Sequence, residues 1–193
     1  MTNPNFKATG QGSQQAFNDI VNNVTNNYNY VQKKLPSYLS QVIFHLDKSI
    51  GVNVEFKYPD RKLYEIEEKI KYNSVKKYKD IISEWGIYGA VIDDIYETLD
   101  NEKPNSKEKF LLNINLIYKN ILGEYVKLNQ SLSKANILEN CSDDIIDSVL
   151  QKLESNFYKS AINGNLHVED IQLCLTVIVC KAFIDCKILE VPV

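Results

Sequence analysis

The chain has 193 residues, of which 44% are hydrophobic and 24% charged, and its formal net charge is −3. This composition is typical of a soluble globular protein with room for one core. The negative charge, with Arg61 as the single arginine, argues against nucleic-acid binding, because phosphate recognition favours cations and the guanidinium group. The sequence has no secretory signal and no apolar run near the roughly 20 residues of a membrane span, which predicts a cytoplasmic protein without a membrane segment.

Residues 1–34 form a segment rich in asparagine. An apolar stripe crosses it in steps of three and four residues, the spacing of a helix face or a coiled-coil seam: Phe17, Ile20, Val24, Tyr28 and Val31. Asparagine is a poor helix former, so the segment should be too weak to fold alone and should gain order where several copies meet. We expect residues 13–34 to be an assembly element of a homo-oligomer; the alternative is a disordered tail.

Residues 35–62 predict one helix followed by an extended stretch. Pro36 suits the first turn of a helix that runs to about Ile50 and stops at Gly51. Apolar residues then alternate with polar ones from Val52 to Tyr58, the pattern of a strand. A lone strand has no partner within one chain, so it is either an extended linker or pairs between subunits.

Residues 63–193 predict a helical bundle domain, so that the whole chain is all-α with about six helices. Asn73 is expected to cap a helix over 74–85, and Asn105 with Glu108 resembles a capping box that opens a helix through about Leu132. Ser142 is expected to open the next helix. The last one, roughly 168–187, is apolar nearly all round, as expected of a central helix.

The sequence offers few groups for catalysis. Cys174, Cys180 and Cys186 recur every six residues and would point about 120° apart around a helix, so we interpret them as buried core residues and not as metal ligands. His45 and His167 stand in no metal-binding spacing, and the seven glycines form no phosphate-binding loop. We therefore expect no cofactor.

Two carboxylate pairs keep an enzymatic alternative open. Asp93 with Glu97, and Asp143 with Asp147, each share a helix face, and such pairs hold a divalent cation in some helical metalloenzymes. A metal-dependent hydrolase would need all four to converge on one ion. The structural interpretation places Asp143 in a first helical turn, where the helix dipole favours acids, and Asp93 on a solvated face.

Two stretches resemble a known family. "YEIEEKIKYNSVKKYKDIISEWG" (64–86) and "AFIDCKILEVP" (182–192) are similar to signatures of small helical C-terminal domains in bacterial ABC-three-component systems, and the resemblance spans about 63–192. The asparagine-rich lead is also similar to N-terminal tracts of bacterial defence proteins. Five positions match the signatures and are implied as a partner interface: Lys69, Tyr72, Asn73, Lys187 and Glu190. Without the resemblance, Asn73 is explained as a helix cap, and Lys187 and Glu190 are explained as residues at a helix C-terminus.

The resemblance implies a role in a conflict or antiphage operon. In such systems the domain follows variable effectors and is encoded beside an ABC-type ATPase, so the expected partner is an effector or that ATPase. No effector domain precedes the bundle in this sequence, which favours a stand-alone adaptor or regulator. We expect a non-enzymatic adaptor or regulatory protein that oligomerises through its N-terminal segment.

Overall fold

The computed structural model describes residues 34–50, 60–161 and 165–192. The chain divides into two units, residues 1–34 and residues 35–193, at the boundary where the asparagine-rich composition ends. The predicted strand at 52–58 lies outside the described residues. So do the five residues of the predicted assembly stripe, which are Phe17, Ile20, Val24, Tyr28 and Val31.

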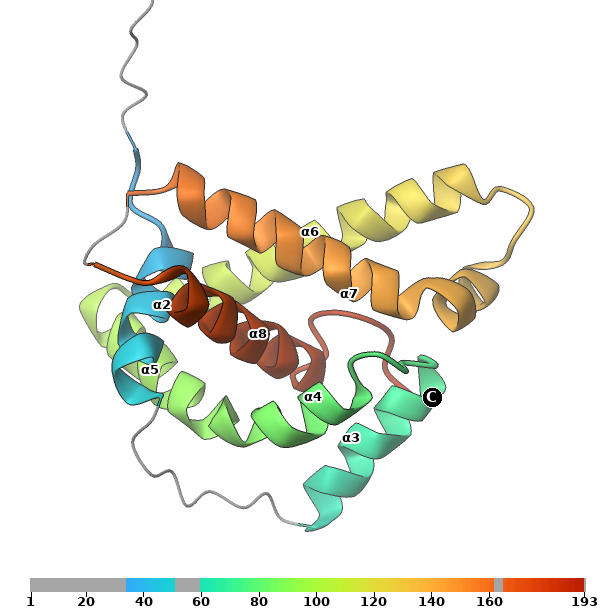
Figure 1. Cartoon of the computed structure of the whole chain (residues 1–193), viewed down its shortest axis with the longest axis horizontal. Helices are drawn as coiled ribbons and strands as arrows, with labels where there is room; N and C mark the ends of the chain where they lie inside the picture. The colour runs from blue at the N-terminus through green and yellow to red at the C-terminus, as the bar shows by residue number, and fades with distance from the viewer. Residues whose placement is uncertain (1–33, 51–59, 162–164, 193) are drawn as a thin grey trace, which may run out of the picture. The chain divides into compact units, whose positions relative to one another are not determined.

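The described part of the second unit is built from helices (Figure 1). In chain order they are α2 (Tyr38–Ser49), α3 (Asp60–Tyr72), α4 (Lys79–Trp85), the 3-10 turn η1 (Gly86–Tyr88), α5 (Gly89–Glu102), α6 (Ser106–Leu128), α7 (Lys134–Lys159) and α8 (Val168–Ile184). None of the described residues lies in a strand. The prediction of an all-α bundle is confirmed.

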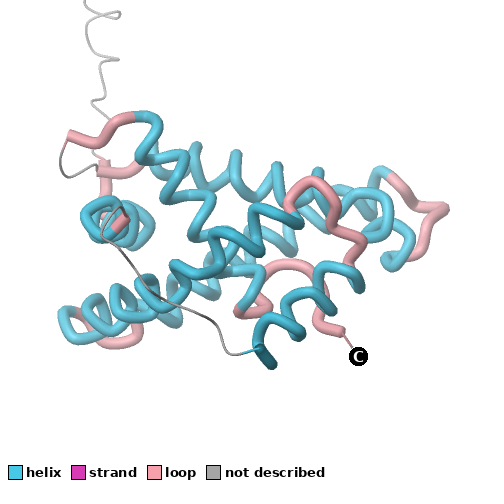
Figure 2. The backbone as a smooth tube through the Cα atoms, turned by 60° about the horizontal axis from the view of Figure 1, so that its bottom comes forward, coloured by secondary structure: helices cyan, strands magenta, loops and turns pink. Residues whose placement is uncertain are grey.

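Helix α8 is the centre of the bundle. It packs against α2, α4, α5 and α7 and against η1. Figure 1 shows it among these four helices, and Figure 2 shows the described residues as helices joined by loops. A helix enclosed in this way must be apolar on nearly every side. Its buried residues accordingly run almost without interruption from Cys174 to Phe183.

Helix α2 belongs to the core of the bundle. Leu39, Val42, Ile43 and Leu46 are buried, and the helix packs mainly against α5 and α8. We assigned residues 35–62 to a helix and linker separate from the bundle domain at 63–193, but α2 packs within the bundle and its apolar face covers part of α8. The helix starts at Tyr38, two residues later than the position of Pro36 indicated.

The starts of α6 and α7 are capped differently from what we expected. Asn105 has left-handed backbone (φ 66°) and makes no side-chain cap; the Lys107 N–H instead donates to Asp100 Oδ1 at 2.8 Å. The expected capping box is therefore wrong. Helix α7 begins at Lys134 under a Ser133 cap, so Ser142 lies inside the helix, where its hydroxyl donates to the Leu138 carbonyl.

The turn before α4 is held by α7. Asn73 does not cap this helix, which starts at Lys79. The Asp143 carboxylate accepts the backbone N–H groups of Lys76 and Lys77 at 3.1 Å, which fixes the turn that leads into α4. Asp143 thus acts at the start of another helix, and our interpretation of it by the dipole of its own helix is wrong.

The four cysteines are free thiols. Cys174 and Cys180 are buried in α8, as predicted. Cys186 is exposed, because α8 ends at Ile184 and the last cysteine follows the helix. Within the described ranges, no helix combines the length and the apolar character needed to cross a membrane.

Candidate functional site

The chain makes a tight turn where α8 ends and then runs back along α3 and α6. We call residues 185–192 the C-terminal segment. Its turn is a Schellman motif, in which the Lys187 N–H donates to the Ala182 carbonyl at 2.8 Å. Cys186 occupies the left-handed position of this motif, with φ 58°, where glycine is the usual residue. Ile188 and Leu189 are buried, so the segment closes one end of the core.

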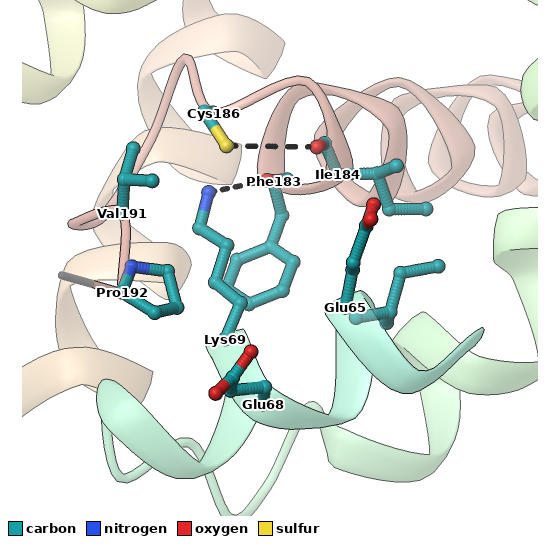
Figure 3. A pocket seen from close by; sticks show the side chains of 9 residues that line it. Glu65, Glu68, Lys69, Phe183, Ile184, Cys186, Val191 and Pro192 are labelled. Atoms are coloured by element: carbon teal, nitrogen blue, oxygen red, sulfur yellow. Dashed lines mark hydrogen bonds between the residues drawn. The ribbon is translucent and has the colours of Figure 1, made fainter. Parts of the chain in front are cut away.

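Lys69 of α3 binds the end of α8 and the C-terminal segment through its side chain. Its side chain is only 3% exposed, and its Nζ donates to the carbonyls of Phe183 and Ile188 while lying 4.5 Å from the centre of the Phe183 ring (Figure 3). Burial lowers the pKa of Lys69 because it removes water from the ammonium form, while Cys186 and two nearby carboxylates act in the opposite direction. The lysine thus satisfies carbonyls at the end of α8 and in the segment beyond it.

Asn73, the residue that follows the end of α3, pairs with the backbone of Glu190. Its Nδ2 donates to the Glu190 carbonyl at 2.8 Å, and its Oδ1 accepts the Glu190 N–H at 2.9 Å. The side chain is 1% exposed. One asparagine therefore pairs both backbone groups of a residue that belongs to no helix or strand, as a neighbouring strand would.

The Glu190 carboxylate connects two further helices. Its Oε1 accepts the Tyr118 hydroxyl of α6 at 3.0 Å and the Lys134 Nζ of α7 at 2.7 Å. The hydrogen bond from Lys134 is the main reason that the pKa of Glu190 lies below its usual value. We call Lys69, Asn73 and Glu190 the C-terminal clasp.

The structure therefore brings together three of the five residues implicated by the family resemblance. Lys69 and Asn73 are buried and use their polar groups inside the chain. Tyr72 is 51% exposed, and Lys187 is half-buried with its carbonyl accepting from Asn115 of α6. A contact of any of the five with a partner stays a prediction. The explanation by a helix C-terminus is wrong for Glu190, which lies beyond the turn that ends α8, whereas the Lys187 N–H closes the Schellman motif of that turn.

A pocket of about 240 Å³ opens beside the clasp (Figure 3). Glu65 and Glu68 of α3 stand on one side, and Cys186 and Pro192 of the C-terminal segment on the other, with Lys69 between them. A second depression of about 430 Å³, bordered by α6, shares Cys186 as a lining residue. Cys186 thus lines two surface pockets.

A second buried lysine lies near the end of α8. Lys181 forms ion pairs with Asp93 of α5 at 2.9 Å and with Asp185 at 2.8 Å. Asp93 is therefore a partner of a buried cation and not a member of a purely solvated face. Nearby, the Tyr96 hydroxyl is buried without a hydrogen-bond partner. Sequence reasoning missed this network; the signal was a lysine inside the otherwise apolar run of α8.

The four carboxylates of the hydrolase hypothesis do not gather. Asp93 pairs with Lys181, Asp143 binds the turn before α4, Asp147 pairs with Lys77 at 2.7 Å, and Glu97 is exposed. In the ranges that the structure describes, no group of three or more His, Cys, Asp or Glu side chains could hold a metal ion. Asp93 and Asp147 act as ion-pairing groups, and Asp143 holds the turn before α4.

The chain matches the model of a known protein family. Residues 37–190 match the model of the CTD10 family, described as C-terminal domain 10 of the ABC-three component (ABC-3C) systems. No curated protein and no solved structure matches the chain. The matched region contains α2 to α8 and all three residues of the clasp.

Proposed function

We propose that this chain, which belongs to the CTD10 family of C-terminal domains of ABC-three-component conflict and defence systems, is a non-enzymatic adaptor that binds a protein of the same system. The observation that carries the proposal is the family match over 37–190, because a component of a multi-protein system needs protein contacts. The expected partner is an effector or the ABC-type ATPase of the same operon.

The use of the polar groups supports a binding role. The clasp, the ion pairs of Lys181 and the carboxylates of α7 all hold one element of the bundle to another. Groups that are saturated with intramolecular partners give the domain a fixed shape, and a fixed shape lowers the entropic cost of binding.

The apolar surface of α6 is the contact face that we assign to the partner. Leu112 is 61% exposed and Leu116, one turn later, is 56% exposed. Residues four apart on a helix lie on one face, so the two leucines form a single patch, which we call the α6 patch. A helix face with such anchors suits an apolar surface of a partner protein.

Binding of the purified ATPase or effector encoded beside the chain tests this assignment. Replacing both leucines (Leu112→Ser with Leu116→Ser) should weaken binding at least about tenfold, because two exposed apolar anchors are lost. Leu128→Ser is the matched control, since Leu128 is 82% exposed but lies on another side of α6. Equal losses for patch and control, or no loss from the patch, would reject this face.

The N-terminal segment is assigned to assembly. This part of the proposal rests on the apolar stripe from Phe17 to Val31 in the sequence. Light scattering of the full chain and of a shortened chain that starts at Leu35 tests it, because residues 35–193 form a unit of their own. The full chain should have a multiple of the monomer mass and the shortened chain should not. Equal masses across a concentration series would remove the assembly role.

A further inference from the structure

Two reactive side chains from distant parts of the chain face each other at the clasp. In Figure 3 the Lys69 amine, from α3, points toward the sulfur of Cys186, from the C-terminal segment. Of the interactions that raise the pKa of Lys69 against the effect of burial, those with Cys186 are the largest. A nitrogen nucleophile and a thiol are therefore held together by the fold.

A neutral Lys69 amine can keep both of the hydrogen bonds that Nζ donates. The carbonyls of Phe183 and Ile188 accept from Nζ, which accounts for both N–H groups of a neutral –NH₂. In Figure 3 the same nitrogen lies beside the Cys186 sulfur. Burial favours the same state, because it disfavours the ammonium form.

Cys186 meets the other requirement, which is access. It is the exposed member of the four free cysteines, and it lines both hollows near the clasp. Its left-handed backbone turns the side chain out of the helical path that Cys174 and Cys180 follow into the core. A small oxidant such as a peroxide can therefore reach this sulfur more readily than the two buried ones.

We propose that Lys69 and Cys186 form a reversible covalent link when the protein meets a peroxide. In the first step the Cys186 sulfur attacks a peroxide oxygen: an S–O bond forms, the O–O bond breaks, and water leaves for hydrogen peroxide. The sulfur is oxidised by two electrons to a sulfenic acid. In the second step the Lys69 lone pair attacks that sulfur, an S–N bond forms, and the hydroxyl leaves as water with a proton from the amine. The sum is thiol, amine and peroxide giving a sulfenamide and two waters.

Thiols reverse the link. A thiolate attacks the sulfur, the S–N bond breaks, and the amine takes up a proton; a second thiol then releases Cys186 as a disulfide forms between the two reductants. While it is present, the link ties α3 to the end of α8 and secures the C-terminal segment. The fold thus carries an oxidant-sensitive lock on the segment that closes its core.

Peptide mapping of the full chain after brief hydrogen peroxide treatment tests the proposal. Trypsin should yield residues 63–71 joined to residues 182–187, lighter by two hydrogens than the sum of the separate peptides, with cleavage after Lys69 blocked. Dithiothreitol before digestion should abolish this species. Hydrogen exchange of the C-terminal segment should slow in the oxidised protein and recover on reduction.

Variants separate the link from general oxidation. Cys141→Ser removes another free, half-buried thiol and should leave the joined peptide unchanged, whereas Cys186→Ser should abolish it. Lys69→Arg keeps a nitrogen hydrogen-bond donor at this position but offers no amine of the same reactivity, so Cys186 should then stop at its sulfenic or sulfinic acid. The proposal is overturned if wild-type Cys186 is oxidised to these acids, or to a disulfide, with no bond to Lys69.

Discussion

Replacing Asn73 with alanine tests how much the clasp contributes to stability. The substitution removes the two hydrogen bonds from Asn73 to the Glu190 backbone. The part-buried N–H and carbonyl of Glu190 have then lost their partner. A third bond, from Nδ2 to the Lys69 carbonyl at 2.9 Å, matters less, because that carbonyl keeps the backbone N–H of residue 73. At about 1 kcal/mol for each neutral hydrogen bond, Asn73→Ala should lower the free energy of unfolding by about 2 kcal/mol.

Asn140→Ala is the matched control for this measurement. Asn140 makes the same kind of local bond, from Nδ2 to the Asn136 carbonyl at 2.7 Å, but it is exposed. Its loss should change the free energy of unfolding by less than about 0.5 kcal/mol. For a chain of this length, a 2 kcal/mol loss corresponds to a fall in Tm of about 4–8 °C.

Urea unfolding of the wild type and both variants gives the free energies, and hydrogen exchange gives the local effect. The Glu190 amide should exchange faster in Asn73→Ala and not in Asn140→Ala, since its N–H is bound to Asn73 Oδ1. If both variants lose the same stability, or if the Glu190 amide stays protected in Asn73→Ala, the clasp does not hold the C-terminal segment as argued.

Three other substitutions test local features of the same region. Cys186→Gly should stabilise the fold by about 0.5–1 kcal/mol in thermal unfolding, because glycine adopts the left-handed φ of 58° without strain; a loss of stability would contradict this. Tyr96→Phe should raise Tm, because it removes a buried hydroxyl that has no partner; a fall would indicate a polar partner for that oxygen. The pKa of Glu190 is lower in the folded protein than in the unfolded chain. Its ionised carboxylate therefore contributes fully to the free energy of unfolding above the unfolded pKa of about 4.3, and this contribution is lost as the pH falls through the folded pKa. Acid titrations of stability should therefore show a smaller loss in Glu190→Gln than in the wild type, and identical curves would refute the linkage.

The helices and the core could be predicted from periodicity because both depend on residues close in sequence. The stripe of α2 from Leu39 to Leu46 is buried as its spacing indicated, and the nearly continuous apolar character of α8 identified the central helix. The starts of α4 and α6 could not be predicted in the same way. Asp143 binds the turn before α4, and it lies 67 residues away from Lys76 in the sequence. Asp100 binds the Lys107 N–H in the first turn of α6.

The sequence indicated the residues of the clasp but not the contacts that they make. The family resemblance selected Lys69, Asn73 and Glu190, yet local rules assigned Asn73 and Glu190 to helix ends. Asn73 pairs with Glu190, which is 117 positions away in the sequence. Lys69 binds Ile188, which is 119 positions away. Such pairings depend on how the C-terminal segment folds back across α3, which helical periodicity does not encode.

The most direct test of the adaptor proposal is co-elution of the purified chain with the ABC-type ATPase and the effector encoded beside it, with mass measured by light scattering. We predict a complex of fixed stoichiometry with at least one of them, which is lost when Leu112 and Leu116 are both serine and kept in Leu128→Ser. Separate elution of the chain from both proteins, at concentrations well above those in the cell, would contradict the proposal that it acts by binding a protein of its own system.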